Sequence, residues 1–368
     1  MICNSARKFI GEAAHCLDLA MELNARGHSA LLVVRGGSEL EERARAAGVT
    51  CESLVFSGSF NPITDYADMR KLQRIIRGHH AEIVHCHRGK DHWVAAFAVA
   101  ATTPVPRIVR TRHVITAMRN HAANRWLLRN RTDAVIAVSQ IAADSFGSML
   151  PLIQEKLRVV YSGVDTAAFT TDKRSEAWRA SIGVEHGEKL IGLIARMQAI
   201  KGQEVFLRAA AMVNAQASDT RFLIAGRSCG TKPEQYMTLA RELGIADRVI
   251  IRDWLDDVQT AMASLDVGVL ASRGSEGSSR VTYEYMASGL PIVATAVGCI
   301  PEVLRDGETG LVVPPDDPDA MAGAISRILD STELGSTLSN SARDRALNFH
   351  NRERWLREIT AVYAGSPN

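Results

Sequence analysis

Short apolar runs alternate with longer amphipathic stretches along almost the whole chain, and this alternation restricts the fold more than any other feature. The runs are nearly continuous in apolar character, as in parallel strands that helices cover on both faces. The sequence therefore predicts an α/β fold with doubly wound parallel sheets. The runs occupy residues 29–34, 81–87, 107–111, 133–139, 157–161, 189–195, 221–226, 248–252, 266–272, 291–295 and 310–313.

The runs pause between residues 161 and 189, where polar residues collect. A chain of 368 residues is also longer than one ordinary core supports. We expect an N-terminal domain over 1–165, to which a helix at about 350–368 returns, and a C-terminal domain over 166–349. Only Met1 to Asn4 precede the first loop, so the first strand is either very short or lacks native residues.

Charge is unevenly divided between these two parts. Residues 1–165 hold 21 Lys or Arg and 15 Asp or Glu, a net of +6, and the remainder holds 22 and 26, a net of −4. The first part is therefore inclined toward anionic partners. No apolar run of about 18 residues predicts a membrane span, no signal-peptide pattern opens the chain, and six scattered cysteines favour a reducing, cytoplasmic location.

Two glutamates, Glu276 and Glu284, stand eight residues apart around a predicted helix start near Arg280 or Val281. A helix start presents N–H groups and partial positive charge, which suits a phosphate. Carboxylates on either side would then accept hydrogen bonds from hydroxyls that flank the phosphates, as in a sugar nucleotide. The alternative from spacing alone is a capped surface helix with one solvated glutamate.

Basic residues follow another predicted strand, at Arg196 and Lys201. Ligands in open α/β sheets bind at such strand ends, and an arginine with a nearby lysine suits a diphosphate. On its own, such a pair more often lies in a solvated loop.

These residues carry a resemblance. The stretches IARMQAIKG (194–202), FLIAG (222–226) and 253–325, with an E-x7-E element and DGETGLVVPPDDP, resemble the C-terminal domain of family 4 retaining glycosyltransferases. The resemblance implies the GT-B fold, two Rossmann-like domains facing each other across a cleft. It also implies a metal-independent enzyme without a cofactor, whose donor is a nucleotide-diphosphate sugar, UDP- or GDP-linked.

The resemblance also implies roles for individual residues. Glu276 would hold sugar hydroxyls, Glu284 the ribose, and Arg196 and Lys201 the leaving diphosphate. Around them, further contacts are implied for Gly277, Ser278, Ser279, Arg280 and Val281 with the sugar and phosphates, and for Leu255 and Asp257 with the base.

In the N-terminal domain, relatives carry a glycine-rich loop after the first strand. Gly11 and Glu12 match it, but Ile10 replaces a second glycine, which leaves the phosphate contacts of the loop open. His113 matches a histidine near the donor sugar, where a neutral imidazole would hydrogen-bond a hydroxyl. A surface or packed histidine is the alternative.

A second pair of histidines, His85 and His87, lies two apart on one strand face. No carboxylate or thiol completes a zinc spacing, so packing at the strand end is favoured and no metal site is predicted.

The acceptor side is indicated by a basic stretch, 107–131, which resembles the RTRH region of bacterial lipopolysaccharide and surface-glycan transferases. It would contact anionic lipid headgroups or a phosphorylated acceptor, and solvated arginines are the alternative. Nucleic acid is disfavoured because no nucleic-acid motif accompanies the charge. Its arginines are Arg107, Arg110, Arg112, Arg119, Arg125, Arg129 and Arg131.

Together these features predict a retaining glycosyltransferase that acts on a glycan or lipid-linked acceptor, cytoplasmic and peripheral at the inner face of the plasma membrane. Two alternatives remain open. One is a catalytically silent GT-B protein that binds nucleotide sugars, and the other is a GT-B nucleotide-sugar epimerase.

Overall fold

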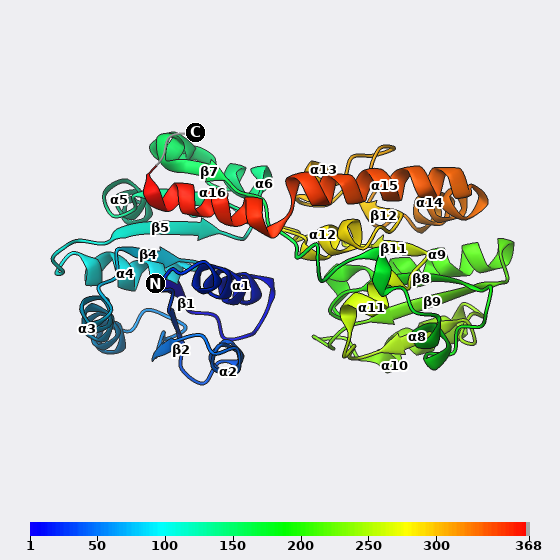
Figure 1. The fold of residues 1–368 in the computed structure, drawn as a ribbon, viewed down its shortest axis with the longest axis horizontal. Helices are drawn as coiled ribbons and strands as arrows, with labels where there is room; N and C mark the ends of the chain where they lie inside the picture. Colours follow the sequence, from blue (N-terminus) through cyan, green and yellow to red (C-terminus); the bar gives the residue numbers. More distant parts are fainter. Residues whose placement is uncertain (366–368) are drawn as a thin grey trace. The chain divides into compact units, whose positions relative to one another are not determined.

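The computed structural model describes residues 1–365, which divide into two compact units (Figure 1). Unit 1 comprises Met1–Tyr161 together with residues 355–365, and unit 2 comprises Ser162–Arg354. Among the described residues, no helix has both the length and the apolar character needed to cross a bilayer.

Unit 1 is built on a seven-stranded parallel sheet in the order β3-β2-β1-β4-β5-β6-β7. Its strands are β1 (Ile2–Asn4), β2 (Leu32–Arg35), β3 (Cys51–Leu54), β4 (Ile83–Cys86), β5 (Arg107–Arg112), β6 (Ala134–Ala137) and β7 (Leu157–Val159). Its helices are α1 (Gly11–Ala25), α2 (Glu39–Ala46), α3 (Pro62–Gly78), α4 (Gly89–Val99), α5 (Ala122–Asn130), α6 (Gln140–Asp144) and α7 (Leu150–Ile153). Buried residues of α16 (Arg352–Ala364), among them Trp355 and Ile359, belong to the core of this unit.

Unit 2 is built on a six-stranded parallel sheet in the order β10-β9-β8-β11-β12-β13. Its strands are β8 (Lys189–Ile194), β9 (Thr220–Ala225), β10 (Val249–Arg252), β11 (Val267–Leu270), β12 (Ile292–Thr295) and β13 (Leu311–Val313). Its helices are α8 (Glu176–Ser181), α9 (Gln203–Gln216), α10 (Pro233–Glu242), α11 (Val258–Ala263), α12 (Arg280–Ala287), α13 (Ile300–Val303), α14 (Pro318–Asp330) and α15 (Thr332–Phe349).

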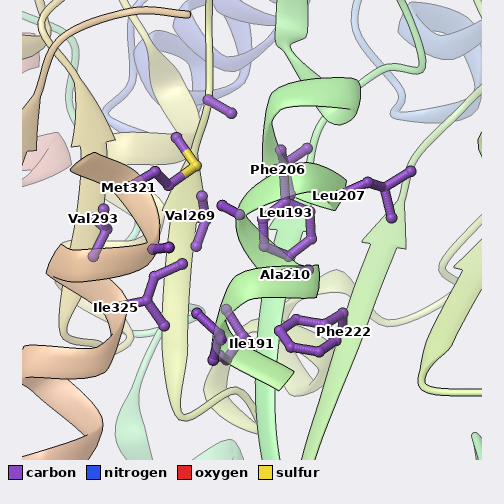
Figure 2. Close-up of a cluster of buried hydrophobic side chains, with 14 of the residues drawn as sticks. Ile191, Leu193, Phe206, Leu207, Ala210, Phe222, Val269, Val293, Met321 and Ile325 are labelled. Carbon is purple, nitrogen blue, oxygen red and sulfur yellow. The ribbon is translucent and has the colours of Figure 1, made fainter. Parts of the chain in front are cut away.

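The core of unit 2 shows why the apolar runs become strands. Phe206 and Ala210 lie on one face of α9 because they are four residues apart, and they pack over Ile191 and Leu193 of β8 (Figure 2). On the neighbouring strands, Met321 and Ile325 of α14 cover Val269 and Val293 in the same way. The apolar strand residues and the apolar face of each helix therefore form one buried hydrophobic layer.

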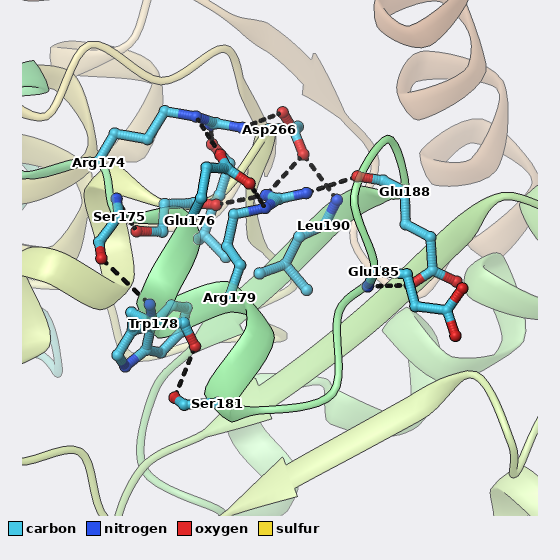
Figure 3. A network of polar contacts seen from close by, with 12 residues as sticks. Arg174, Ser175, Glu176, Trp178, Arg179, Ser181, Glu185, Glu188, Leu190 and Asp266 are labelled. Carbon is cyan, nitrogen blue, oxygen red and sulfur yellow. Dashed lines mark hydrogen bonds and ion pairs between the residues drawn. The ribbon is translucent and has the colours of Figure 1, made fainter.

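Polar residues before β8 belong to unit 2. Asp266 accepts hydrogen bonds from Arg174 (3.1 Å), from the buried Arg179 (3.0 Å) and from the backbone N–H of Leu190 (2.8 Å) (Figure 3). The segment in which the strand runs pause is thus attached to the amino-terminal ends of the central strands β8 and β11 by charge-assisted hydrogen bonds.

The predicted doubly wound parallel sheets are confirmed, and each of the eleven predicted runs contains a strand. The first strand, β1, has three residues and pairs with both β2 and β4. The prediction missed β3, whose sequence CESL has little apolar character. Its backbone pairing with β2 holds this polar segment in the sheet.

Candidate functional site

Each sheet has a point at which the strand order reverses, and in unit 2 this point lies between β8 and β11. Chain segments that leave two such strands diverge, so a hollow forms beyond their carboxyl ends. Arg196 and Lys201 follow β8, and Glu276 follows β11. The sequence-predicted residues of unit 2 are therefore collected at the point where this type of sheet binds ligands.

Gly202 brings the two loops into direct contact. Its φ is +71°, and a Cβ atom at this position would lie 1.8 Å from the carbonyl oxygen of Ala271. Two residues before Gly202 and two after Ala271, the N–H of Arg273 donates to the carbonyl oxygen of Ile200 at 2.8 Å. Only glycine permits both this backbone conformation and this approach.

Because the loops touch, Lys201 reaches Glu276. The ammonium group of Lys201 forms an ion pair with the Glu276 carboxylate, which also accepts a hydrogen bond from the Ser272 hydroxyl at 2.5 Å. Glu276 is only 5% exposed, so the carboxylate is held by these partners rather than by water. Two side chains that the sequence assigns to different parts of a ligand are thus already in contact.

The loop before α12 positions Glu276 through its backbone. The carbonyl oxygen of Glu276 accepts from the N–H of Cys299 at 2.8 Å. Gly298, at a φ of +58°, passes so close that a Cβ atom would lie 2.0 Å from the same oxygen. A second glycine contact therefore supports the carboxylate from the loop after β12.

Helix α12 begins at Arg280, as predicted. Ser279 is in the left-handed conformation, and its side chain does not cap the helix. Its hydroxyl instead accepts from the Thr282 hydroxyl at 2.8 Å. The helix start is formed by a strained backbone turn, with Gly277 and Ser279 buried and Ser278 and Val281 half-buried around it.

Glu284 lies one turn into α12, 4.0 Å from Arg280. It lines a small cavity of unit 2 together with Arg280, Tyr283, Asp165 and Arg352. Helical side chains lean toward the N-terminus, so the carboxylate lies on the same side as the helix start.

Tyr285 is a site-supporting residue that the sequence analysis missed. Its hydroxyl accepts from the N–H of Ile194 (2.9 Å) and donates to the carbonyl oxygen of Gly192 (3.1 Å), which fastens α12 to β8. Gly268 makes room, because a Cβ atom there would lie 2.8 Å from the tyrosine ring. Glycines inside two apolar strand runs were the available signal.

The other predicted residues of unit 2 are more exposed. Arg196 is half-buried, and its backbone carbonyl accepts from Gln203 at 2.8 Å. Leu255 is half-buried, whereas Asp257 is exposed and caps α11 by accepting from the N–H (3.0 Å) and hydroxyl (2.6 Å) of Thr260. These hydrogen bonds lower the pKa of Asp257. Its carboxylate therefore acts as the N-cap of α11.

In unit 1 the strand order reverses between β1 and β4. Gly11 begins α1, and the Glu12 carboxylate accepts from Asn4 at 3.0 Å and lies 3.6 Å from Arg88. Burial raises the pKa of Glu12, and the positive charge of Arg88 opposes this. The first turn of α1 thus contains a carboxylate of the protein itself, that of Glu12.

A histidine cluster lies at the same point, and the sequence analysis paired its members differently. His87 Nδ1 lies 2.9 Å from His113 Nε2, and His15 completes a group whose ligand nitrogens are within 4.8 Å of one another. These three could hold a metal ion. His85 packs against His87, with ring centres 4.2 Å apart, as predicted, and its ring nitrogens contact Tyr363 (2.7 Å) and Thr111 (2.6 Å).

Burial lowers the pKa of His85, His87 and His113 below the usual histidine value. Their imidazoles are therefore neutral at neutral pH. Neutral rings both donate and accept hydrogen bonds, so this cluster can bind hydroxyl groups without adding charge to the site.

The structure corrects the expectation of one basic surface over 107–131. Arg110 and Arg112 of β5 are only 8% and 6% exposed, and Arg107 donates to the carbonyl oxygen of Tyr363 at 2.8 Å. These three side chains contact the fold itself, because elements cover both faces of this strand, Arg110 and Arg112 lying on one face and Arg107 on the other. The exposed members are Arg119, Arg125, Arg129 and Arg131.

Comparisons with known proteins agree with this arrangement. Residues 11–168 match the family model described as Glycosyltransferase Family 4, and residues 188–331 match the one described as Glycosyl transferases group 1. A D-inositol 3-phosphate glycosyltransferase of Mycolicibacterium vanbaalenii is 29% identical over 96% of this chain and 84% of its own length.

Among solved structures, a glycosyltransferase from Rickettsia africae superposes with a TM-score of 0.89 at 20% identity, over 99% of this chain and 97% of that one. Anabaena HepE in complex with UDP-glucose superposes with a TM-score of 0.82 at 20% identity, over 99% and 98%. At these identities the likeness concerns the GT-B fold.

Proposed function

Because the chain belongs to the glycosyltransferases of the family 4 and group 1 kind, we propose that it transfers a sugar, with retention, from a nucleotide-diphosphate sugar to a glycan or lipid-linked acceptor. The observation that carries the proposal is the Lys201–Glu276 ion pair beside the start of α12, at the strand-order reversal of unit 2. This arrangement offers positive charge to a diphosphate and a carboxylate to sugar hydroxyls.

In the proposed reaction the bond between the anomeric carbon and the β-phosphate oxygen breaks. The acceptor oxygen bonds to the same face of that carbon, and its proton passes to the leaving phosphate. Lys201, Arg196 and the start of α12 stabilise the negative charge that develops on the diphosphate. Since these groups supply the positive charge, the proposed reaction requires no metal ion.

The remaining predicted residues complete the donor site. Glu276 orients the sugar, Glu284 accepts from the ribose hydroxyls, and the backbone at Leu255 and Asp257 contacts the base. His113 offers a neutral imidazole to a sugar hydroxyl. UDP is the favoured nucleotide because Anabaena HepE, of the same fold, was solved with UDP-glucose.

The acceptor is proposed to belong to bacterial lipopolysaccharide or surface-glycan synthesis, with the enzyme at the cytoplasmic face of the membrane. The exposed arginines near α5 support this, since anionic headgroups attract basic side chains near a membrane.

A thermal-shift panel tests the donor site. The purified chain is heated with UDP-, GDP- and ADP-sugars in the presence of EDTA, and a ligand that binds the folded state raises the melting temperature. We expect one nucleotide series to stabilise the protein, Glu284→Ala to abolish the shift, and the exposed-site control Glu308→Ala to retain it. Stabilisation that survives in Glu284→Ala, or that requires a metal ion, would contradict the proposal.

A further inference from the structure

Helices α3 and α4 of unit 1 pack against each other, and a groove of about 740 Å³ lies where both helices begin. Its lining is mainly aromatic and aliphatic: Phe60, Pro62, Tyr66, Met69, Trp93 and Phe97. Phe60 is 84% exposed and the nearby Ile63 is 83% exposed. Exposure of such large side chains in one place marks a binding surface rather than scattered surface hydrophobics.

The concentration of apolar side chains here is specific to this region. Eleven large hydrophobic residues are exposed in the described chain, and five of them belong to segment 55–66 or to α4. None of these five is explained by the donor site of unit 2.

The interior of the groove carries no net charge. Its two ionised side chains, Asp65 and Lys90, form an ion pair with each other. Lys90 also donates to the carbonyl oxygen of Ser59 at 3.0 Å, and Asp65 accepts from the Ser57 hydroxyl at 3.1 Å. Because these charges are already partnered, the groove favours an occupant that is apolar and uncharged along its length.

Positive charge borders the groove on two sides. The guanidinium of Arg7 lies against Gly58, where a Cβ atom would be 2.2 Å from it. On the α4 side, Trp93 stacks on Trp126 of α5 with ring centres 6.1 Å apart, and Arg131 lies 5.3 Å over Trp126.

The stretch of sequence that contains α5 is also basic. Arg119, Arg125 and Arg129 are exposed, and residues 107–131 include no aspartate or glutamate. An apolar groove with a cationic border matches a molecule that has a hydrocarbon chain and an anionic headgroup.

The position of the groove connects it to the chemistry. The loop that lines it follows β3, and α4 follows β4, so the groove opens at the carboxyl edge of the sheet. His87 and Arg88 leave β4 at the same edge. The groove therefore opens at the same end of the strands as His87 of the histidine cluster.

We propose that this groove binds the hydrocarbon chain of a lipid-linked acceptor whose headgroup is anionic. The inference rests on the proposed transferase function, whose acceptor class it specifies. The aromatic rings contribute contact area at the membrane interface, where such side chains prefer to lie, and the arginines bind the headgroup.

The test uses the full chain and two lipid probes, with no donor present. One probe is vesicles of phosphatidylcholine with or without phosphatidylglycerol, measured by flotation. The other is soluble dioctanoyl phosphatidylglycerol, measured by calorimetry. The groove variant is Phe60→Ser/Phe97→Ser, and the control is Trp254→Ser in unit 2, an aromatic residue that is 56% exposed.

We expect the groove variant to bind both anionic probes at least about tenfold more weakly, the control to bind like the wild type, and neutral vesicles to bind weakly throughout. Unchanged binding by the groove variant would overturn the proposal. A variant that loses binding to vesicles but still binds the soluble lipid would also overturn it, because this indicates insertion into the membrane surface. So would a dimer of the wild type that the variant dissociates, because this indicates that a second copy of the chain occupies the groove.

The result can be separated from that of the donor panel. Phe60 is largely exposed, so its replacement is compatible with folding, and an unchanged melting temperature checks this. Intact donor binding with no lipid binding would reject the groove and leave the transferase proposal standing. Lipid binding without any donor binding would reject the proposed donor site and leave the groove standing as a lipid-binding site.

Discussion

The two units share a strand order yet carry different chemistry at the corresponding place. In each unit the first and fourth strands of its sheet are neighbours, and the candidate site residues follow those strands. Unit 2 places an ion pair and a helix start there, whereas unit 1 places buried carboxylates and neutral histidines. Topology thus determines where a ligand binds, and the side chains decide what is bound.

The backbone differs between the two places as well. In unit 2, glycines at 202 and 298 let loops touch atom to atom, which fixes the charged side chains. In unit 1, Gly89 at the start of α4 has open space around its Cα. These contacts pre-organise the proposed donor site, an arrangement that favours stabilisation of a transition state.

The largest expected effect tests this contrast in packing. Gly202→Ala forces a Cβ atom against the Ala271 carbonyl in a left-handed conformation, and should lower the free energy of unfolding by about 3 kcal/mol or more. The matched change Gly89→Ala meets no neighbour and should alter it by less than about 0.5 kcal/mol. Urea denaturation of both variants measures the difference, and equal losses would remove the contrast.

The second prediction concerns the ion pair of unit 2. Glu276→Gln removes the negative charge while keeping the shape, and should lower kcat about 100-fold because the interaction acts on the transition state. Nucleotide affinity should change far less, since Glu276 is assigned to the sugar. Steady-state kinetics with the best donor of the thermal-shift panel and Glu308→Gln as control provide the measurement. A variant as active as the wild type would disprove the assigned role.

The third prediction uses the buried histidine that follows Asp91. His92 Nε2 lies 3.0 Å from the Thr132 hydroxyl, which itself donates to the Leu127 carbonyl, so the imidazole is the donor and its other nitrogen is unprotonated. Burial lowers its pKa. Below about pH 6.5 the unfolded chain therefore takes up a proton that the folded chain refuses, and stability is lost as the pH falls.

In His92→Gln the free energy of unfolding should therefore fall less between pH 6.5 and 5.5, by about 1 kcal/mol. Asp91 changes the stability with the opposite sign. Burial raises the pKa of Asp91 to about 7, so its protonation stabilises the folded chain as the pH falls through that value. Asp91→Asn should accordingly make the acid loss steeper. Urea denaturation at the two pH values tests both variants, and parallel pH profiles would show that neither group titrates as described.

Much of the architecture could be read from local pattern. Strands covered on both faces require continuous apolar runs, so eleven of the thirteen strands were visible as such runs. The start of α12 at Arg280 was also predictable, from small polar residues between a strand and an amphipathic stretch. β3 escaped because its partner strand, rather than its own apolar content, holds it in the sheet.

The contacts that create chemistry were decided by tertiary structure alone. Lys201 and Glu276 are 75 residues apart, and their ion pair exists because Gly202 lets two loops meet. Likewise, His87 also meets His113, 26 residues away, because β4 and β5 are neighbours in the sheet. Local sequence determines which segments become strands and helices, since that depends on periodicity and propensity. Which side chains meet, and which arginines are buried, depends on strand order and packing, which bring distant parts of the chain together.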